Sequence, residues 1–282
     1  MRTLITGSTG FIGSSYMKDM NLEDVHVLSR QARETNTMGI VSHCGDIRDK
    51  EFLSELARLR FERIIHFAWQ GLPSLTPENN AINLEIAMDF FDVMRQSGVR
   101  EINVTGSCLE YGDLKSSVTE YNPGSNVNDF GKTKVTLLDY LDSAQIPYRW
   151  FRIFYAYGPK QHLRSLLCSA YQNTKKGIPL GIQNLKASHD FIYVGDVARA
   201  IGMLLSTPDS YGVFNIGSSV PNSVGKMVNL LLDAMGSDET VEEDRTDCLL
   251  ANIDKIQSIC EWSPQVSVEV GVTRFLEWCE TQ

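Results

Sequence analysis

The sequence predicts an α/β fold, a doubly wound parallel β-sheet with a smaller lobe formed mainly by the C-terminal part of the chain. Short apolar segments alternate at least four times with segments of helical spacing, an order typical of a parallel sheet with helices on both faces. A glycine-spaced turn directly follows the first apolar segment, and polar residues collect where several later segments end. Ligands bind beyond the carboxyl ends of strands in such sheets, so these polar residues are candidate site residues.

The expected strands are short apolar segments bounded by charged residues, glycine or proline. Residues 64–69, for example, lie between a charged stretch and the turn-like segment Gln70-Gly71-Leu72-Pro73, as expected of a strand that is buried on both faces. In chain order, the expected strands are residues 4–5, 25–28, 39–43, 64–69, 102–105, 148–154, 191–194 and 212–217.

The expected helices have apolar residues three or four positions apart, as residues 83–97 do. In chain order, they are residues 11–20, 50–59, 83–97, 130–141, 163–176, 196–205, 224–235 and 268–278. From this order we expect a large sheet domain at residues 1–153, completed by 190–217. Residues 154–189 and 218–282 are expected to form the smaller lobe.

The turn between the first strand and the first helix reads Thr6-Gly7-Ser8-Thr9-Gly10-Phe11-Ile12-Gly13. A pyrophosphate binds well to free backbone N–H groups at the positive end of a helix dipole. Gly7 would allow the tight turn, Gly10 would let the backbone approach phosphate, and Gly13 would let the helix lie close to the sheet. The turn therefore predicts a site for a dinucleotide. The residues expected to line it here are Gly7, Thr9, Gly10, Phe11, Ile12 and Gly13.

The end of the second expected strand bears on the choice of dinucleotide. An acidic residue at this place binds the adenosine ribose of NAD, whereas a guanidinium suits the 2′-phosphate of NADP. The chain has Ser29 and then Arg30, with no carboxylate. This pair favours NADP(H) over NAD(H), unless Arg30 is only a solvated loop residue.

The composition excludes several other classes of protein. A net charge of −9 and a pI near 5.1 argue against general affinity for nucleic acid or an anionic membrane. The six cysteines have neither CxxC spacing nor histidines at ligand spacing, so we expect no metal site and a reducing, cytoplasmic location. No apolar run approaches the roughly 20 residues of a membrane span, and no signal peptide is expected.

Eight short motifs follow one another along nearly the whole chain. They are the Gly7/Gly10/Gly13 turn, Gly45 to Asp49, His66-Phe67-Ala68, Thr105-Gly106-Ser107 with Tyr111-Gly112, Gly131 to Lys134, Tyr157-Gly158-Pro159, Asp190 to Val194 with Asp196, and Asn215-Ile216-Gly217. With these motifs the chain resembles the extended short-chain dehydrogenase/reductase family of nucleotide-sugar epimerases, dehydratases and ketoreductases. The resemblance implies a Rossmann-like sheet that binds NAD(P).

The resemblance also implies roles for individual residues. Ser107 would hydrogen-bond the substrate carbonyl. Lys134 would bind the nicotinamide ribose and lower the pKa of a neighbouring tyrosine. The residues that would lie along the cofactor, with the adenine contacts first, are Asp46, Ile47, Phe67, Ala68, Trp69 and Thr105.

Three longer segments are most similar to the branch of this family that reduces 4-keto-6-deoxy nucleotide sugars. They are residues 66–73, 106–112 and 152–158. The 4,6-dehydratases look different because they place Asp-Glu after the Ser or Thr, and elimination of water needs that acid and base. This chain has Cys108-Leu109 there, which disfavours a dehydratase.

The family's reactive tyrosine belongs four residues before Lys134, one helical turn away, and this chain has Phe130 there. Loss of a positioned proton donor is expected to cost roughly 10²- to 10⁴-fold in rate while leaving binding intact. Three interpretations stay open: an engineered Tyr→Phe variant that traps a ligand complex, a natural enzyme with another proton donor, or a non-catalytic relative that binds NADP(H). The candidate donors in the second case are Cys108, Tyr155, Tyr157 and His189.

Substrate contacts are expected from the cleft and the smaller lobe. His189 stands where the family usually has an arginine that binds substrate phosphate, so another basic residue could take that role. Several residues also have a purely structural interpretation. Cys108 could be a buried apolar filler, Glu110 the cap of a turn, and Asp196 a helix N-cap. The expected substrate contacts are Ser107, Cys108, Glu110, Tyr155, Arg164, His189 and Arg245, with Lys186 as a further basic candidate.

The predicted function is NADPH-dependent reduction of the 4-keto group of a nucleoside-diphosphate 6-deoxy sugar, in deoxysugar or polysaccharide biosynthesis. Ser107, Phe130 and Lys134 would mark the catalytic site. The enzymatic alternative is a nucleotide-sugar 4-epimerase, which retains its cofactor through both half-reactions. The resemblance further suggests a homodimer, paired through the helices at 83–97 and 130–141.

Overall fold

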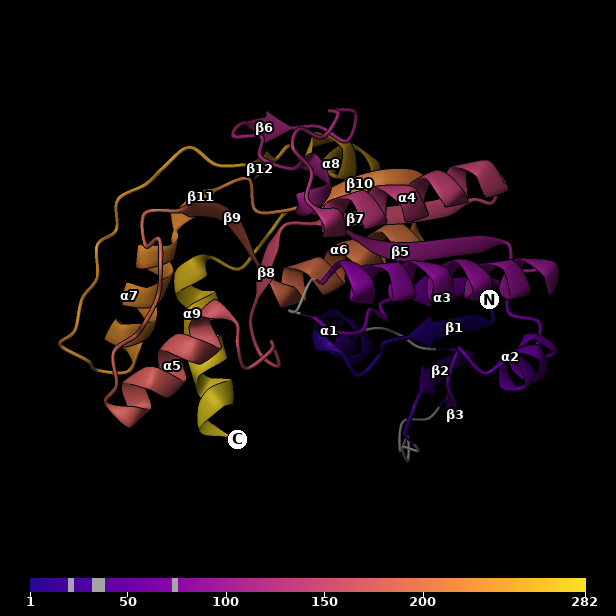
Figure 1. The fold of residues 1–282 in the computed structure, drawn as a ribbon, viewed down its shortest axis with the longest axis horizontal. Coiled ribbons are helices and arrows are strands. Elements are labelled where there is room, and N and C mark those ends of the chain that lie inside the picture. Colours follow the sequence, from indigo (N-terminus) through magenta and orange to yellow (C-terminus); the bar gives the residue numbers. More distant parts are fainter. Residues whose placement is uncertain (20–22, 32–38, 73–75) are drawn as a thin grey trace.

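The central layer of the molecule is a seven-stranded sheet (Figure 1). The computed structural model describes residues 1–19, 23–31, 39–72 and 76–282, so Met20 and Pro73 of the predicted elements lie outside the described residues. All neighbouring strands are parallel, in the order β10-β7-β5-β4-β1-β2-β3. The strands are β1 (Thr3–Thr6), β2 (Val25–Ser29), β3 (Ile40–Cys44), β4 (Arg63–His66), β5 (Glu101–Ser107), β7 (Tyr148–Ile153) and β10 (Gly212–Ile216). The predicted doubly wound parallel sheet is confirmed.

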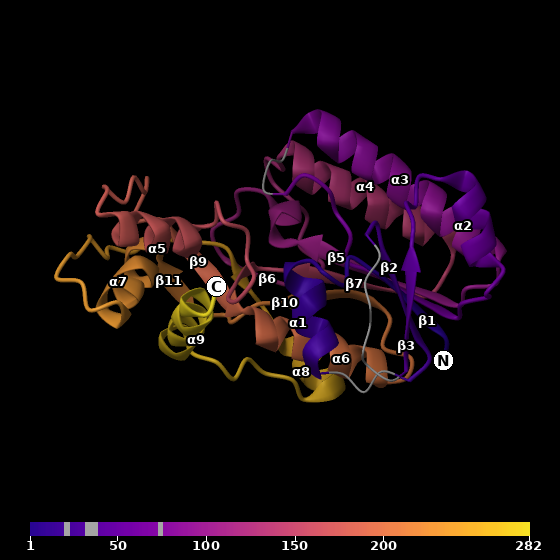
Figure 2. The same cartoon turned by 90° about the horizontal axis from the view of Figure 1, so that it is seen from below.

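Helices cover both faces of this sheet (Figure 2). One face carries α2 (Lys50–Ala57), α3 (Pro77–Gln96) and α4 (Asp129–Ala144), and the other carries α1 (Phe11–Asp19), α6 (Val194–Ser206) and α8 (Asp254–Cys260). Helix α3 begins six residues before the predicted start at 83, because Thr76 caps it by accepting the Asn79 N–H and Pro77 occupies its first turn. None of the helices in the described part of the chain is long and apolar enough to span a bilayer.

A second lobe lies to the left in Figure 1. Its three-stranded sheet has the order β11-β9-β8. The strands are β8 (Tyr155–Tyr157), β9 (Ser188–Tyr193) and β11 (Pro221–Ser223), and the helices are α5 (Leu166–Lys176), α7 (Val224–Ala234) and α9 (Val268–Glu280). These elements share an apolar core of their own that includes Leu167, Met227 and Phe275.

The chain crosses between the two lobes more often than the sequence predicts. Residues 190–217 are expected to complete the large sheet, but only β10 of this segment joins it, whereas β9 belongs to the small sheet. The buried carboxylate of Asp190 explains the difference, because it accepts hydrogen bonds from the N–H groups of Ser218 and Ala251 and ties β9 to chain outside the large sheet. Conversely, α8 belongs to the expected smaller lobe but packs Ile256 into the core of the large domain.

Besides β8, β11 and α8, three further short elements are absent from the sequence-based expectation. They are the 3-10 turn η1 (Cys108–Tyr111) and the two-residue strands β6 (Ser117–Val118) and β12 (Leu250–Ala251), which pair with each other. Asp196 is not the N-cap of α6, because the helix begins at Val194 and is preceded by Tyr193. Its buried carboxylate instead accepts the N–H groups of Gln265 and Val266, which ties the C-terminal tail to α6.

Candidate functional site

The glycine turn forms a cradle without side chains between β1 and α1. Gly7 has a φ of +70°, and a Cβ added there would come within 2.6 Å of the Ala68 nitrogen. A Cβ at Gly13 would lie 2.2 Å from the Gly7 carbonyl oxygen, so the helix approaches the turn as closely as glycine permits. The first N–H groups of α1 have no partner within the helix, and they attract a phosphate. The cradle therefore fits the diphosphate of a dinucleotide.

A groove of about 900 Å³ opens from this cradle along the carboxyl ends of the strands. It is lined by ten of the residues expected at the cofactor: Gly7, Thr9, Gly10, Ser29, Arg30, Asp46, Ile47, Phe67, Ala68 and Trp69. Gln31, Gly45, Gln70, Gly71 and Leu72 also line the groove but are not among the predicted contacts. Each of them lies just beyond an expected strand, a signal that could have identified them.

Among the described residues at the end of β2, the groove carries a guanidinium and no carboxylate. Ser29 and the exposed Arg30 lie there, while Asp46 follows the neighbouring strand β3. The Asp46 carboxylate accepts hydrogen bonds of 2.6 to 3.1 Å from the Arg48 guanidinium. These bonds hold the pKa of Asp46 below its usual range, so the carboxylate stays charged and paired. Arg30 lies near enough to lower that pKa a little further.

Lys134 is buried beside the groove rather than in it. Its ammonium donates a 2.9 Å hydrogen bond to the Thr105 carbonyl and lies 3.6 Å from the centre of the Trp69 ring. Trp69 lines the groove and Lys134 does not, so the indole covers the amine on that side. The Trp69 Nε1 atom is itself buried and has no hydrogen-bond partner. The expected contact between Lys134 and a ribose would require the indole to move aside.

We expect Lys134 to make stability depend on pH. Burial lowers its pKa to about 7, whereas an unfolded lysine titrates near 10.4. Between these values the unfolded chain binds more protons than the folded chain, so the free energy of unfolding should rise with pH. Urea unfolding at pH 7, 8 and 9 should therefore show the wild type gaining stability relative to Lys134→Met as pH rises. A difference that is the same at all three pH values would contradict this.

Phe130 lies on the same face of α4 as Lys134, one turn earlier. Its ring is 8% exposed, meets the Trp69 ring edge-on at 5.7 Å, and lies 5.7 Å from the Lys134 ammonium. The residue therefore has the position expected of the reactive tyrosine but offers no proton.

Ser107 ends β5 at the same edge of the sheet. Its hydroxyl oxygen accepts the Leu109 N–H at 3.1 Å and caps η1, which leaves the hydroxyl hydrogen to be donated elsewhere. This orientation is compatible with the expected hydrogen bond to a substrate oxygen.

The Glu110 carboxylate is buried and bound by other residues of the chain. The residue is 2% exposed, and its carboxylate accepts hydrogen bonds from the Arg152 guanidinium at 2.7 Å, the Trp150 indole at 3.0 Å and the Ser107 N–H at 2.7 Å. The alternative role as the cap of a turn is the one observed, since Ser107 and Glu110 form a capping box around η1.

Cys108 is also a poor candidate for a proton donor. Its side chain is buried in the core of the large domain, and burial raises the pKa of the thiol above its usual range. The role of an apolar filler describes it better than that of a substrate contact or proton donor.

Tyr155 and His189 form the polar end of the second lobe. Their rings stack with centres 3.9 Å apart on neighbouring strands β8 and β9. Burial raises the pKa of Tyr155 and lowers that of His189, so both are neutral near pH 7. Tyr157, by contrast, is buried, and its hydroxyl donates to the Ser267 carbonyl at 3.4 Å. Tyr155 and His189 are thus the better of the alternative donors.

The remaining basic candidates are not assembled into a phosphate site. Arg164 and Arg245 are exposed and do not line the groove. Lys186 is paired with Glu242 and Asp244 at 2.8 and 2.9 Å, which largely neutralises its charge.

The family model "NAD dependent epimerase/dehydratase family" matches residues 3–217. The chain belongs to this family. It is 25% identical over 313 residues to the low-salt glycan biosynthesis protein Agl12 of Haloferax volcanii, across 99% of this chain and 98% of that protein. It is also 25% identical over 268 residues to the UDP-glucose 4-epimerase of Streptomyces lividans, across 83% of this chain and 80% of that protein.

The fold is shared with solved enzymes of this kind. One is the UDP-glucuronic acid 4-epimerase of Bacillus cereus, solved as a Tyr-to-Phe mutant with UDP-4-deoxy-4-fluoro-glucuronic acid and NAD. The two structures superpose with a TM-score of 0.85 at 20% identity, over 100% of this chain and 99% of that one. The family resemblance drawn from the sequence motifs is confirmed. The chain belongs to an enzyme family that includes nucleotide-sugar epimerases.

Proposed function

We propose that this protein is an NAD(P)-dependent nucleotide-sugar 4-epimerase. The observation that carries the proposal is the groove that runs from the glycine cradle to Trp69, whose ring meets that of Phe130 edge-on. The named relatives support epimerisation better than the 4-keto reduction predicted from the sequence, because two of them are 4-epimerases.

The residues of this chain would have the following roles. Backbone N–H groups at Phe11 to Gly13 would hold the diphosphate, and the dinucleotide, when bound, would supply hydride chemistry at the sugar C4. Ser107 would donate a hydrogen bond to the C4 oxygen. The 4-keto sugar would turn between the two hydride transfers, so that its other face meets the cofactor. Phe130 cannot take the proton that leaves the C4 oxygen, so proton transfer would have to pass through another group, such as Tyr155, His189, Ser107 or water. We therefore expect sugar binding with slow turnover.

Proton NMR of UDP-glucose incubated with the cofactor-loaded protein tests the proposal. Slow appearance of the C4 epimer without net consumption of cofactor is the expected result. If no epimer forms and a 4-keto-6-deoxy nucleotide sugar instead consumes one NADPH per product, the protein is the reductase that the sequence motifs favour.

We propose NAD(H) as the retained cofactor, as in the Bacillus cereus complex, with Arg30 allowing NADP(H) to bind as well. Arg30→Ala should weaken NADPH binding about 10- to 100-fold, because a charge-assisted hydrogen bond to the 2′-phosphate is lost. NADH binding should stay within about twofold of the wild type. Calorimetric titration with both coenzymes measures this, and Arg58→Ala, an exposed arginine at the far end of α2, is the control. Equal weakening for both coenzymes would mean that Arg30 contacts their shared part.

Homodimerisation through α3 and α4 remains a prediction. Ile82 of α3 is exposed and available to a second copy, whereas Phe90, Phe91 and Leu137 are buried within the chain.

A further inference from the structure

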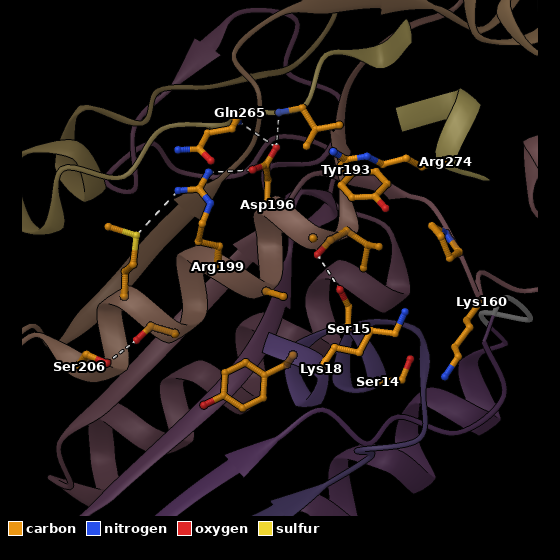
Figure 3. Close-up of a pocket in the computed structure, with 18 residues that line it drawn as sticks. Ser14, Ser15, Lys18, Lys160, Tyr193, Asp196, Arg199, Ser206, Gln265 and Arg274 are labelled. Carbon is orange, nitrogen blue, oxygen red and sulfur yellow. Dashed lines mark hydrogen bonds and ion pairs between the residues drawn. The ribbon is translucent and has the colours of Figure 1, made fainter. Parts of the chain in front are cut away.

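A second cavity, of about 680 Å³, lies on the face of the large sheet that carries α1 and α6 (Figure 3). Both lobes contribute to it: α1 and α6 come from the large domain, whereas Lys160 and Arg274 come from the loop after β8 and from α9. We call it the α1–α6 pocket. None of its described lining residues lines the cofactor groove. The proposed epimerase reaction does not involve this pocket, and Ser107, Phe130 and Lys134 do not line it.

The α1–α6 pocket has an excess of positive charge. Lys18, Lys160 and Arg274 line it, all three are exposed, and none forms an ion pair with a described residue. The carboxylate among the described lining residues, Asp196, is buried and satisfied by Arg199 at 2.7 Å and by two backbone N–H groups. A chain with a net charge of −9 thus places around one cavity three cations that form no ion pair with a described residue, one of which, Arg274, lies over the Tyr193 ring. Such a local reversal of potential attracts anions.

The loop that carries Lys160 is held in a defined shape. Gly158 donates its N–H to the Gln161 side chain at 3.1 Å, and the Gln161 N–H returns to the Gly158 carbonyl at 3.3 Å. Lys160 itself has a φ of +67°, a conformation that few lysines adopt. The tight turn therefore fixes the direction from which this side chain enters the pocket.

The two ends of the pocket differ in chemistry. In Figure 3 the amino groups of Lys18 and Lys160 and the hydroxyl of Ser14 gather at one end, and Ser206 marks the other. The wall along α6 between them includes the small or apolar residues Ala198, Gly202 and Met203, beside the ion pair of Asp196 and Arg199. A compact dianion suits the first end, and a less polar body suits the wall.

We propose that the α1–α6 pocket binds a phosphate-bearing organic metabolite. Its phosphate lies between Lys18 and Lys160, and its organic part lies against α6. The volume of about 680 Å³ exceeds what a bare phosphate would fill. Because the pocket joins α1, which begins at the glycine cradle, to α9 of the second lobe, the bound metabolite contacts both lobes at once.

The test is calorimetric titration of the full chain with ribose 5-phosphate, in the presence of saturating NADH and UDP so that the groove and the sugar-nucleotide site are occupied. We expect saturable binding with one site per chain. The double variant Lys18→Ala/Lys160→Ala should weaken it at least tenfold, because two unpaired cations are removed. The matched control is Lys175→Ala/Lys176→Ala, which removes two exposed lysines at the end of α5, and it should bind within about twofold of the wild type.

Lys18 and Lys160 have no ion-pair partners among the described residues, so both double variants should unfold at the temperature of the wild type. No binding, or binding that survives in Lys18→Ala/Lys160→Ala, would overturn the proposal. Inorganic pyrophosphate distinguishes a second source of phosphate: if it binds as tightly as ribose 5-phosphate, the assignment of the organic part to α6 is wrong.

Discussion

Replacing Phe130 by tyrosine is expected to raise kcat by roughly 10²- to 10⁴-fold, the contribution of a positioned acid–base group. The Phe130 ring already occupies the site, edge-on to Trp69 and 5.7 Å from the Lys134 ammonium. Tyrosine would add the hydroxyl that the Phe130 ring lacks, and the neighbouring Lys134 would favour the ionised form of that hydroxyl. KM for the nucleotide sugar should change only a few-fold, since the hydroxyl acts mainly in the transition state.

Two controls sharpen this experiment. Phe130→Leu alters the packing against Trp69 without adding a hydroxyl, so it should leave the low kcat unchanged. Steady-state rates with a panel of nucleotide sugars, together with coenzyme titration, separate the three interpretations of this position. A Phe130→Tyr protein that binds coenzyme but turns over no sugar would identify a non-catalytic relative.

Removal of Glu110 is expected to destabilise the protein by about 3–5 kcal/mol, the cost of leaving a buried charge without its partner. In Glu110→Ala the Arg152 guanidinium would keep only the Tyr111 hydroxyl and the Glu120 carbonyl as partners. The Trp150 indole and the Ser107 N–H would lose their acceptor as well. Urea unfolding monitored by circular dichroism measures the loss.

The matched control is Glu242→Ala. Glu242 also pairs with a cation, Lys186, at 2.8 Å, but both side chains are more than half exposed. Its removal should therefore change the free energy of unfolding by less than about 1 kcal/mol. If Glu110→Ala instead unfolds like the wild type and only raises KM, Glu110 contacts substrate after all.

The sequence by itself determined the alternation of strands and helices that forms the large sheet, the glycine cradle and the absence of a proton donor at position 130. These features depend on neighbours within a few residues. Gly7, Gly10 and Gly13 define one turn, and Phe130 and Lys134 share a helical face because they are four residues apart. The ends of parallel strands lie at one edge of a sheet, so Ser29, Asp46 and Trp69 could also be assigned to one groove in advance.

Only the tertiary structure decided which partners meet across long separations in the chain. Glu110 pairs with Arg152, 42 residues further along, so a carboxylate expected in the cleft is buried. Trp69 covers Lys134, so a lysine expected at the ribose is shielded. Asp190 joins β9 to segments 28 and 61 residues further along, which moves that strand into the second lobe. The α1–α6 pocket likewise draws Lys18 and Arg274 together from opposite ends of the chain. Such contacts depend on how the layers pack, and local sequence patterns carry no information about that packing.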